Sequence, residues 1–563
     1  MKNKITGGEA LMRSFIAEGV DTIFGYPGGA IMPVYDALYD FRDHLRHILV
    51  RHEQGAAHAA EGYARVTGKT GVVLVTSGPA ATNIITGVTD AMLDSTPMVV
   101  VTGQVVASLL ATDAFQETDI VSITQPITKW SYQIRSASEV AWAIARAFYI
   151  AREGRPGPVV LDFTKNAQTE LVDFHYEPCR FIRSYVPVPK PDMTHIEEAA
   201  KIINQSVRPY AIVGQGVILG HAENEVLAML EKAQIPVAST LLGLSAIPSK
   251  HPLYKGMPGM HGKYSCNVKM NECDVLIGIG MRFDDRITST LNSFAKQATI
   301  IHFDIDQAEL HKNVKADVPV LGNVKETIPL VTALLKPNRH DEWIKSFDSY
   351  DETEYDEVIK EELNPTSKDI KMGEVVHKIS EKTHHDAIFV TDVGQNQMMG
   401  ARYSQFTKSR SFVTSGGLGT MGFGLPAAVG AKIGRPDRIV CLFVGDGGLQ
   451  MTIQEFGTIM QENIGVKIVL LNNNFLGMVR QWQEMFFDER YSFTTMHNPD
   501  FVKIASAYGI KGKRIKDHEE LDSAIEEMFQ DDAPYLLEVQ IEPKGMVFPM
   551  VPAGAPISDV RLK

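Results

Sequence analysis

Cysteine is scarce in this sequence of 563 residues, and that scarcity excludes two classes of protein. The four cysteines, Cys179, Cys266, Cys273 and Cys441, form no Cys-x-x-Cys pair and are too scattered for a disulfide framework or a zinc site. We therefore expect a protein of the reducing cytoplasm.

Long apolar stretches and basic runs are also lacking. No stretch approaches the ~20 apolar residues needed to cross a bilayer. The beginning, MKNKITGGEALMRSFIAEGV, has neither the apolar region nor the cleavage site of a signal peptide. The formal net charge is −13, and Lys and Arg form no basic stripe. We expect a soluble, unexported protein that binds neither membranes nor nucleic acids.

The sequence does contain one repeated pattern of predicted secondary structure, which occurs in three regions. Short apolar runs alternate with helical segments, which is typical of parallel strands buried on both faces. Examples are GVVLVTS (71–77), PMVVVTGQ (97–104), DVLIGIGMRF (274–283), RIVCLFVGDG (438–447) and VKIVLLNNN (466–474). At ~150 residues per domain, the length fits three or four domains. We predict an α/β protein of three doubly wound parallel-sheet domains.

Two stretches interrupt this alternation of strands and helices and mark the predicted domain boundaries. Prolines interrupt residues 175–193, and residues 336–369 are polar and highly charged, as expected of a solvated linker with some helix. The predicted domains are 1–175, 190–337 and 366–545, followed by a tail at 546–563. The first and third domains present a strand, a glycine-bearing turn and a helix in similar order, which indicates related folds.

Candidate metal ligands follow two of the apolar runs. Asp446 stands in Gly-Asp-Gly after one run, and Asn472 and Asn473 stand 26 and 27 positions later at the end of another. One βαβ unit would bring all three to the same edge of a sheet. Carboxylate, amide and carbonyl oxygens suit Mg²⁺ with a bound diphosphate, although Gly-Asp-Gly alone is more often only a turn.

These residues resemble a known family. Gly-Asp-Gly followed at this distance by Asn-Asn is the motif of thiamin diphosphate enzymes. RHEQGAAHAAEGYAR (51–65), MRFDDRIT (281–288), SGGLGTMGFGLPAAVGA (415–431) and GMVRQWQ (477–483) are similar to the catalytic subunit of acetohydroxyacid synthase, also called acetolactate synthase. The resemblance extends from about residue 5 to 550. It implies a pyrimidine-binding first domain, an FAD-binding middle domain and a diphosphate- and Mg²⁺-binding third domain.

The resemblance implies one set of thiamin diphosphate contacts. Asp446, Asn473 and the Phe475 carbonyl would hold Mg²⁺. Met421 would separate the two cofactor rings, although methionine also fills gaps in cores, and the Gly419 carbonyl would accept from the aminopyrimidine. The other implied contacts are Gly29, Ser77, Asn83, Gly394, Gln395, Asn396, Gly447 and Gly448. Asn396 departs from the histidine usual in the family, so we expect altered cofactor affinity.

Glu53 is the implied catalytic acid. In the family, a glutamate in this position hydrogen-bonds the aminopyrimidine ring and assists proton transfer. In an arbitrary sequence, Glu53 would be a helix-start acid favoured by the macrodipole. The nearby HEQGAAH is not a zinc motif, because His58 lies six residues after His52 instead of four.

The resemblance also implies an FAD site, with a structural role for the flavin because the synthase reaction has no net oxidation. Asn323 stands where an aspartate is common. A lone glycine pair such as Gly214 and Gly216 is a weak nucleotide signal, and a single arginine is more often in a surface ion pair. The implied contacts are Arg155, Gly214, Gly216, Thr240, Leu241, His261, Arg282, Asp304 and Asn323.

The implied reaction is decarboxylation of pyruvate and transfer of the two-carbon unit to pyruvate or 2-oxobutyrate, at the start of branched-chain amino acid biosynthesis. Trp482 would favour 2-oxobutyrate by contact with its extra methyl group, and Arg286 would attract the acceptor carboxylate. Phe115, Gln116, Lys165, Met260, Val393 and Met478 would shape the substrate channel. The alternatives are an FAD-dependent pyruvate oxidase and a cofactor-binding protein without activity.

Assembly is implied as well. In the family, each site is completed across a subunit interface, so we expect a homodimer or a dimer of dimers. A separate small regulatory subunit is a further expected partner. The tail at 546–563, rich in proline and glycine, would fold over the site as a lid or form a disordered terminus.

Overall fold

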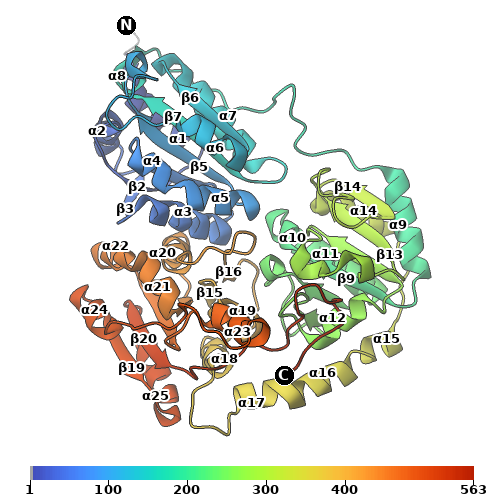
Figure 1. Ribbon diagram of the computed structural model, residues 1–563. Helices are drawn as coiled ribbons and strands as arrows, with labels where there is room; N and C mark the ends of the chain where they lie inside the picture. The colour runs from blue at the N-terminus through green and yellow to red at the C-terminus, as the bar shows by residue number, and fades with distance from the viewer. Residues whose placement is uncertain (1–3) are drawn as a thin grey trace.

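The computed structural model describes residues 4–563, and its fold consists of three α/β domains (Figure 1). Each has a six-stranded sheet whose neighbouring strands all run parallel, as the sequence predicts. The strands form because their residues are apolar and β-branched: every residue of β5 and β18 is buried. Among the described residues, no helix combines the length and apolar character required to span a membrane.

The first domain has the strand order β3-β2-β4-β5-β7-β6. Its strands are β2 (Thr22–Tyr26), β3 (Arg46–Leu49), β4 (Gly71–Val75), β5 (Met98–Gln104), β6 (Trp130–Ile134) and β7 (Pro158–Thr164). Its helices are α1 (Gly7–Ala17), α2 (Met32–Asp40), α3 (Glu53–Thr67), α4 (Pro79–Asn83), α5 (Ile85–Leu93), α6 (Ile120–Thr124), α7 (Val140–Arg152) and α8 (Lys165–Thr169). A short antiparallel pair, β1 (Ile5–Thr6) and β8 (Leu171–Val172), joins its two ends.

The third domain repeats this topology. Its strand order, β16-β15-β17-β18-β20-β19, is the same as that of the first domain when the strands of each sheet are numbered along the chain. This confirms the prediction that the two domains have related folds. The strands are β15 (Ile388–Thr391), β16 (Phe412–Val413), β17 (Val440–Gly445), β18 (Val466–Asn472), β19 (Lys511–Ile515) and β20 (Tyr535–Gln540). The helices are α18 (Met372–Lys382), α19 (Gln395–Tyr403), α20 (Gly424–Gly434), α21 (Asp446–Thr452), α22 (Phe456–Glu462), α23 (Gly477–Phe486), α24 (Phe501–Ala507) and α25 (His518–Met528).

The middle domain has a different order, β11-β10-β9-β12-β13-β14, which is the strand order of dinucleotide-binding folds. Its strands are β9 (Pro209–Val213), β10 (Val237–Ser239), β11 (Tyr254–Gly256), β12 (Val275–Ile279), β13 (Thr299–Asp304) and β14 (Val318–Leu321). Its helices are α9 (Met193–Gln205), α10 (Gln215–Leu219), α11 (Glu223–Ala233), α12 (Tyr264–Met270), α13 (Asp285–Thr288) and α14 (Val324–Leu334).

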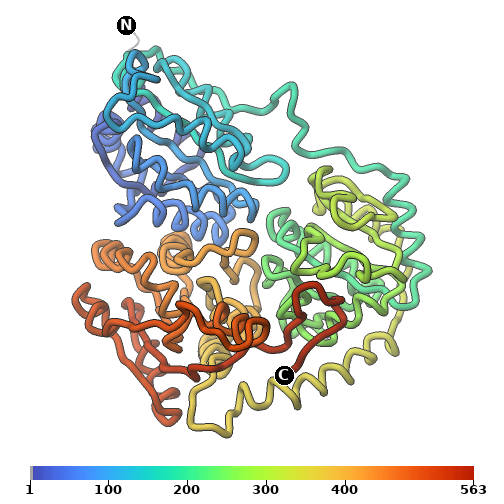
Figure 2. Tube along the Cα trace, viewed as in Figure 1, coloured from blue at the N-terminus to red at the C-terminus, as the bar shows by residue number. Residues whose placement is uncertain are grey.

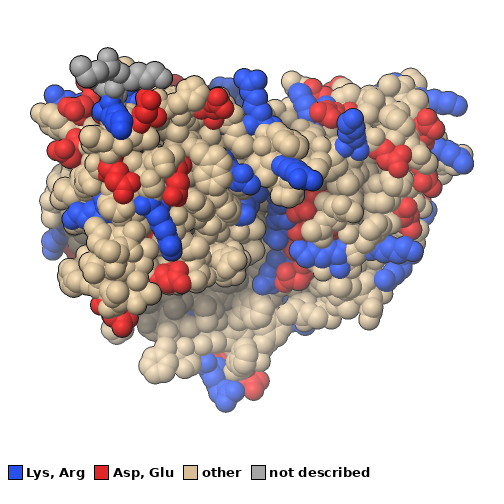
Figure 3. Space-filling model, turned by 90° about the horizontal axis from the view of Figure 1, so that it is seen from above, with Lys and Arg blue, Asp and Glu red and all other residues tan. Residues whose placement is uncertain are grey.

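The first and third domains pack through α3 and α20 (Figure 1). Glycines permit the close approach, because a Cβ at Gly62 would overlap the Ala427 carbonyl and one at Gly430 would overlap the Ala59 carbonyl. Seen from above (Figure 3), Lys and Arg are interspersed with Asp and Glu, and basic side chains gather along a furrow between two lobes.

The charged linker forms more structure than its composition suggests. It contains α15 (Asp341–Lys345), α16 (Asp348–Glu354), a π-helical turn (Tyr355–Ile359) and α17 (Lys360–Leu363). Trp343, Phe347 and Glu354 are buried, and Glu354 forms an ion pair with Arg402 of α19. The linker is therefore a helical segment that packs between the second and third domains (Figure 2). The exact domain boundaries stay a prediction.

Candidate functional site

Two neighbouring strands of the third domain end at the candidate metal ligands. Asp446 directly follows β17, and Asn472 and Asn473 lie at the end of β18, which pairs in parallel with β17 from Val440↔Val466 to Gly445↔Leu471. The helices α21 and α22 form the connection between the strands. The predicted βαβ unit therefore brings these side chains to one edge of the sheet.

A small pocket of about 60 Å³ opens at this edge. Asn473 Oδ1 accepts a hydrogen bond from Phe475 N–H at 3.0 Å, and the side-chain oxygen of Asn396 is buried without a partner. Carboxylate, amide and carbonyl oxygens are ligands that Mg²⁺ prefers, so these residues fit a magnesium-bound diphosphate. The predicted residues that line the pocket are Val393, Gly394, Gln395, Asn396, Met421, Gly447, Gly448, Asn473, Phe475 and Met478.

Asn498, which the sequence reasoning missed, holds the Asp446 carboxylate. The Asn498 amide donates to Asp446 Oδ2 at 2.6 Å and lies 3.2 Å from Asn472 Oδ1 and 3.1 Å from Asn474 Oδ1. Burial raises the pKa of Asp446 to about 6. No sequence motif marks Asn498, because it lies in a loop just before α24.

Asp392 is a second missed residue, and it shapes the turn that carries Met421. Its buried carboxylate accepts N–H groups from Gly422 at 3.0 Å, from Gly424 at 2.9 Å and from Val393 at 2.9 Å. Burial raises the pKa of this carboxyl, while the three backbone donors lower it. The turn at 419–424 is thereby fixed to the end of β15.

A larger pocket of about 970 Å³ adjoins the first, because Val393 and Met478 line both. Its predicted lining residues are Met260, Arg286, Val393, Gly419, Met478 and Trp482, together with Leu241 and His261. Arg286 supplies a guanidinium to largely apolar walls, which suits a small carboxylate with an aliphatic part.

His261 lies in the larger pocket, whereas the sequence assigned it to the flavin. Its Nδ1 is buried without a hydrogen-bond partner, and burial lowers the pKa of the imidazole to about 4, so the ring is neutral near pH 7.

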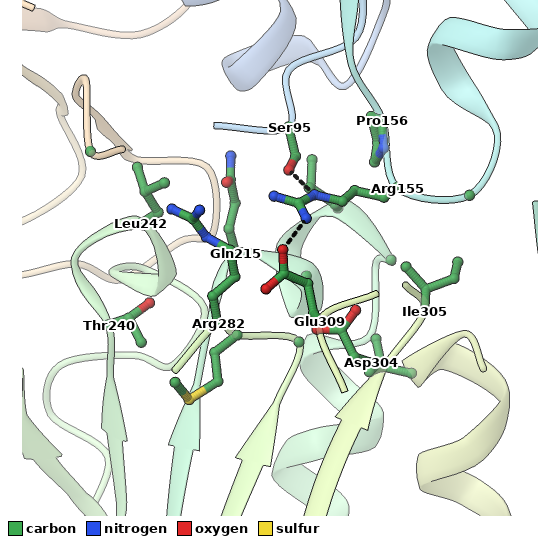
Figure 4. Close-up of a pocket in the computed structure, with 18 of the residues that line it drawn as sticks. Ser95, Arg155, Pro156, Gln215, Thr240, Leu242, Arg282, Asp304, Ile305 and Glu309 are labelled. Atoms are coloured by element: carbon green, nitrogen blue, oxygen red, sulfur yellow. Dashed lines mark hydrogen bonds and ion pairs between the residues drawn. The ribbon is translucent and has the colours of Figure 1, made fainter. Parts of the chain in front are cut away.

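A third pocket of about 300 Å³ lies between the middle and first domains (Figure 4). Of the predicted flavin contacts, Arg155, Gly216, Thr240, Leu241, Arg282, Asp304 and Asn323 line it, and Gly214 lies beside it at the end of β9. A Cβ at Gly216 would lie 2.7 Å from Gly280 Cα, so only glycine permits this backbone approach. The strand order and the glycine pair fit a dinucleotide such as FAD. Leu241 and Arg286 line both this pocket and the larger one.

Arg155 bridges two domains across this pocket. Its Nε donates to Ser95 Oγ at 2.8 Å, and its NH1 donates to Glu309 Oε1 at 2.7 Å (Figure 4). The same NH1 donates to Asp306 Oδ2 at 3.2 Å. Burial raises the pKa of the neighbouring Asp304 carboxyl to about 7. Arg155 is thus already oriented over the pocket by a hydroxyl and two carboxylates.

The predicted thiamin diphosphate contacts and substrate-channel residues of the first domain lie apart from all three pockets. Glu53 Oε2 accepts from Asn83 Nδ2 at 2.9 Å, and Phe115 is 88% exposed. Neither Glu53 nor Asp446 is among the residues that line these three pockets, so none of them brings the two carboxylates of one chain together. The residues of this group are Gly29, Glu53, Ser77, Asn83, Phe115, Gln116 and Lys165, and Gly29, Ser77 and Lys165 come just after β2, β4 and β7.

A buried network joins the first domain to the glycine turn of the third. Arg65 donates to Asp94 Oδ2 at 2.6 Å, and Asp94 accepts from the Gly416 and Gly417 N–H groups at 2.9 and 2.6 Å. Ser415 Oγ donates to Asp90 Oδ1 at 2.8 Å. The network holds the beginning of the turn that leads to Gly419 and Met421.

The chain matches three models of one family. These are described as the N-terminal TPP binding domain, the central domain and the C-terminal TPP binding domain of the thiamine pyrophosphate enzymes, and they match residues 5–123, 196–331 and 392–539. With the sheets and pockets described above, they define the class: the chain belongs to the thiamin diphosphate (thiamine pyrophosphate) enzymes.

Curated relatives define the group within that class. The acetolactate synthase large subunit of Lactococcus lactis subsp. lactis is 45% identical over 98% of this chain and 95% of the relative. The acetolactate synthase isozyme 2 large subunit of Escherichia coli K12 is 43% identical over 99% of this chain and 100% of the relative. The probable acetolactate synthase large subunit of Methanocaldococcus jannaschii is 43% identical over 98% and 95%. The chain belongs to the acetolactate synthase large subunits, and the pyruvate oxidase alternative is not favoured.

Proposed function

We propose that this chain decarboxylates pyruvate and joins the two-carbon unit to a second pyruvate, giving 2-acetolactate, or to 2-oxobutyrate, giving 2-aceto-2-hydroxybutyrate. The product would enter the biosynthesis of valine, leucine and isoleucine. The observation that carries the proposal is the pair of adjoining pockets: one gathers oxygen ligands, and the other combines apolar walls with Arg286. A carboligase needs this combination, because a second 2-oxo acid must be held beside the cofactor.

Thiamin diphosphate, held through Mg²⁺ by Asp446, Asn473 and the Phe475 carbonyl, would supply the carbon nucleophile that attacks pyruvate. The side chain of Met421 would fix the cofactor's bent conformation, and the Gly419 carbonyl would accept from its amino group. The backbone of Gly394, Gln395, Gly447 and Gly448 would line the diphosphate.

FAD would occupy the pocket under Arg155 and Arg282 and would act structurally. Two arginines at the edge of a dinucleotide-type sheet are suited to a pyrophosphate, and the ion pairs of Arg155 join the first and middle domains. The flavin would thus stabilise the arrangement of domains that forms the larger pocket.

The second substrate would be selected by Trp482 and Arg286. The guanidinium would attract the carboxylate of the 2-oxo acid, and the indole would contact the additional methyl group of 2-oxobutyrate. One methylene in an apolar pocket is worth roughly 1 to 3 kcal/mol, enough for a preference of 10-fold or more. Met260, Val393 and Met478 would form the remaining walls.

A second copy of the chain would complete the site. Glu53 hydrogen-bonds Asn83 at a face that lines none of the three pockets described above, and the highly exposed Phe115 belongs to the same group of predicted residues. We propose that this face covers the third domain of a partner in a homodimer or a dimer of dimers, bringing Glu53 to the aminopyrimidine. Phe115, Gln116 and Lys165 would then close the substrate channel. A separate small regulatory subunit is a further proposed partner.

Product analysis tests the proposal. Purified protein is incubated with pyruvate, Mg²⁺, thiamin diphosphate and FAD, with and without 2-oxobutyrate, and compared with Glu53→Gln. We expect acetolactate without stoichiometric flavin reduction and a severe loss of product in the variant. Acetate or acetyl phosphate accompanied by reduced flavin or peroxide would instead establish an oxidase.

A further inference from the structure

The C-terminal segment packs beside the candidate metal site. Residues 545–551 run from the end of the third domain past α23 toward the middle domain (Figure 2), and Val547, Met550 and Val551 are buried. Val551 N–H donates to the Met260 carbonyl at 2.8 Å. The segment therefore packs between the third domain and the middle domain.

Gln481 anchors this segment with both ends of its side-chain amide. Val547 N–H donates to Gln481 Oε1 at 2.9 Å, and Gln481 Nε2 donates to the Val547 carbonyl at 3.1 Å. The Gln481 side chain is fully buried. Because a backbone N–H can only donate and a carbonyl can only accept, Val547 determines which end of the amide is oxygen.

Gln395 transmits that orientation toward the metal ligand. Its Nε2 donates to Gln481 Oε1 at 3.1 Å and to the Gly545 carbonyl at 2.9 Å, which leaves Oε1 as an acceptor. Asn473 Nδ2 donates to this oxygen at 3.2 Å. The opposite end of the Asn473 amide, Oδ1, is therefore directed away from Gln395, toward the Phe475 N–H.

The backbone leaves space for this chain of amides at one position. A Cβ at Gly477 would overlap Gln395 Oε1 and lie 2.7 Å from Asn473 Nδ2. Gly477 begins α23, the helix that also carries Gln481. One helix thus provides both the gap in which Gln395 meets Asn473 and the side chain that holds the C-terminal segment.

We propose that Gln481 is a positioning residue through which the backbone of residues 545–547 orients Asn473 Oδ1 toward Mg²⁺. This inference rests on the proposed function, since it requires Mg²⁺ to bind at Asn473. It follows from linkage that docking of residues 545–547 strengthens Mg²⁺ binding and that Mg²⁺ with thiamin diphosphate strengthens docking of these residues to the same degree.

The test measures Mg²⁺ binding in the presence of thiamin diphosphate and without pyruvate, by calorimetry, for the wild type, Gln481→Met and Thr290→Val. Gln481→Met keeps the side-chain length and removes the hydrogen bonds. Thr290→Val is the matched control, because the Thr290 hydroxyl holds the far end of the segment through the Gly554 and Ala555 carbonyls at 2.8 and 3.0 Å. We expect Mg²⁺ binding to weaken about 3- to 10-fold in Gln481→Met, the effect of about one hydrogen bond, and to be unchanged in Thr290→Val.

Hydrogen exchange of the wild type gives a second measurement that does not depend on a variant folding. We expect Mg²⁺ with thiamin diphosphate to slow exchange of the Val547 amide. Unchanged exchange, unchanged Mg²⁺ affinity in a folded Gln481→Met, or equal weakening in Thr290→Val would overturn the inference. Absence of thiamin diphosphate binding by the wild type would instead contradict the proposed function.

Discussion

Asn498 holds Asp446 by a hydrogen bond of 2.6 Å from its side-chain amide to the carboxylate. The same amide faces the side-chain oxygens of Asn472 and Asn474, so it joins the ends of β17 and β18. A metal ligand that a second residue already holds in place loses less entropy when the ion binds, so Asn498 lowers the free-energy cost of assembling the site.

Replacement of Asn498 is therefore expected to weaken Mg²⁺ binding. In Asn498→Ala we expect Mg²⁺ affinity with thiamin diphosphate present to fall about tenfold, the loss of one hydrogen bond to a charged group at ~1.5 kcal/mol. Calorimetry without substrate measures it. Asn204→Ala, which removes a comparable amide from the surface of the middle domain, is the control. Wild-type Mg²⁺ affinity in Asn498→Ala would show that Asp446 needs no such support.

Complementation tests whether two chains share one site. Glu53→Gln and Asp446→Asn are each expected to be severely impaired as separate proteins. If the site combines Glu53 of one chain with Asp446 of another, mixed dimers contain one intact site, and mixing the two variants after mild dissociation restores product formation. Mixing each variant with itself is the control. If the mixture stays as inactive as its components, Glu53 and Asp446 of the same chain act together.

The sequence predicted the part of the site that depends on local pattern. Asp446 and Asn473 lie at the ends of apolar strands, and parallel pairing brings the ends of such strands together. The proximity of the two residues could therefore be inferred from the sequence. Asn498 and Asp392 could not be found in this way. Their roles come from where a loop and a turn pack, and neither position belongs to a periodic pattern.

Other structural features could not be predicted from the sequence, because the burial of a side chain depends on tertiary packing. The linker reads as solvated, yet Trp343 and Phe347 are buried against the middle domain. His261, assigned to the flavin by its place in a motif, lines the larger pocket, and its role as a flavin contact stays a prediction. Resemblance alone placed Glu53 in the site, and the single chain leaves it at a separate face.

Arg155 is expected to control flavin binding. Arg155→Met removes the guanidinium over the pocket, and we expect FAD affinity to fall roughly 10- to 100-fold, because hydrogen bonds to charged groups are worth about 1.5–3 kcal/mol. Quenching of FAD fluorescence on binding measures this. Glu309→Gln removes one carboxylate that orients Arg155 but keeps the guanidinium, so it should weaken FAD binding less. Arg13→Met, at an exposed ion pair with Glu9, should leave it unchanged. Equal FAD affinity in Arg155→Met and Arg13→Met would exclude Arg155 as a flavin contact.

Glu455 is expected to make stability depend on pH. Its side chain is buried where the first and third domains meet, accepting from Arg51 N–H at 3.1 Å and Thr458 Oγ at 2.6 Å, and burial raises its pKa from 4.5 to about 7. A carboxyl whose folded pKa is raised favours folding in its protonated form. Its contribution to the unfolding free energy is complete below about pH 4.5 and is lost as the pH rises through about 7.

Glu455→Gln removes that loss, because an amide stays neutral at every pH and can still accept from Arg51 and donate to Thr458. We therefore expect the melting temperature of the variant relative to the wild type to rise between pH 5 and pH 8, with a difference of up to about 3 kcal/mol in unfolding free energy. Thermal melting across this range measures it, with the exposed Glu197→Gln of α9 as control. A difference that does not change with pH, or one that the control reproduces, would mean that Glu455 is ionised in the folded protein throughout this range.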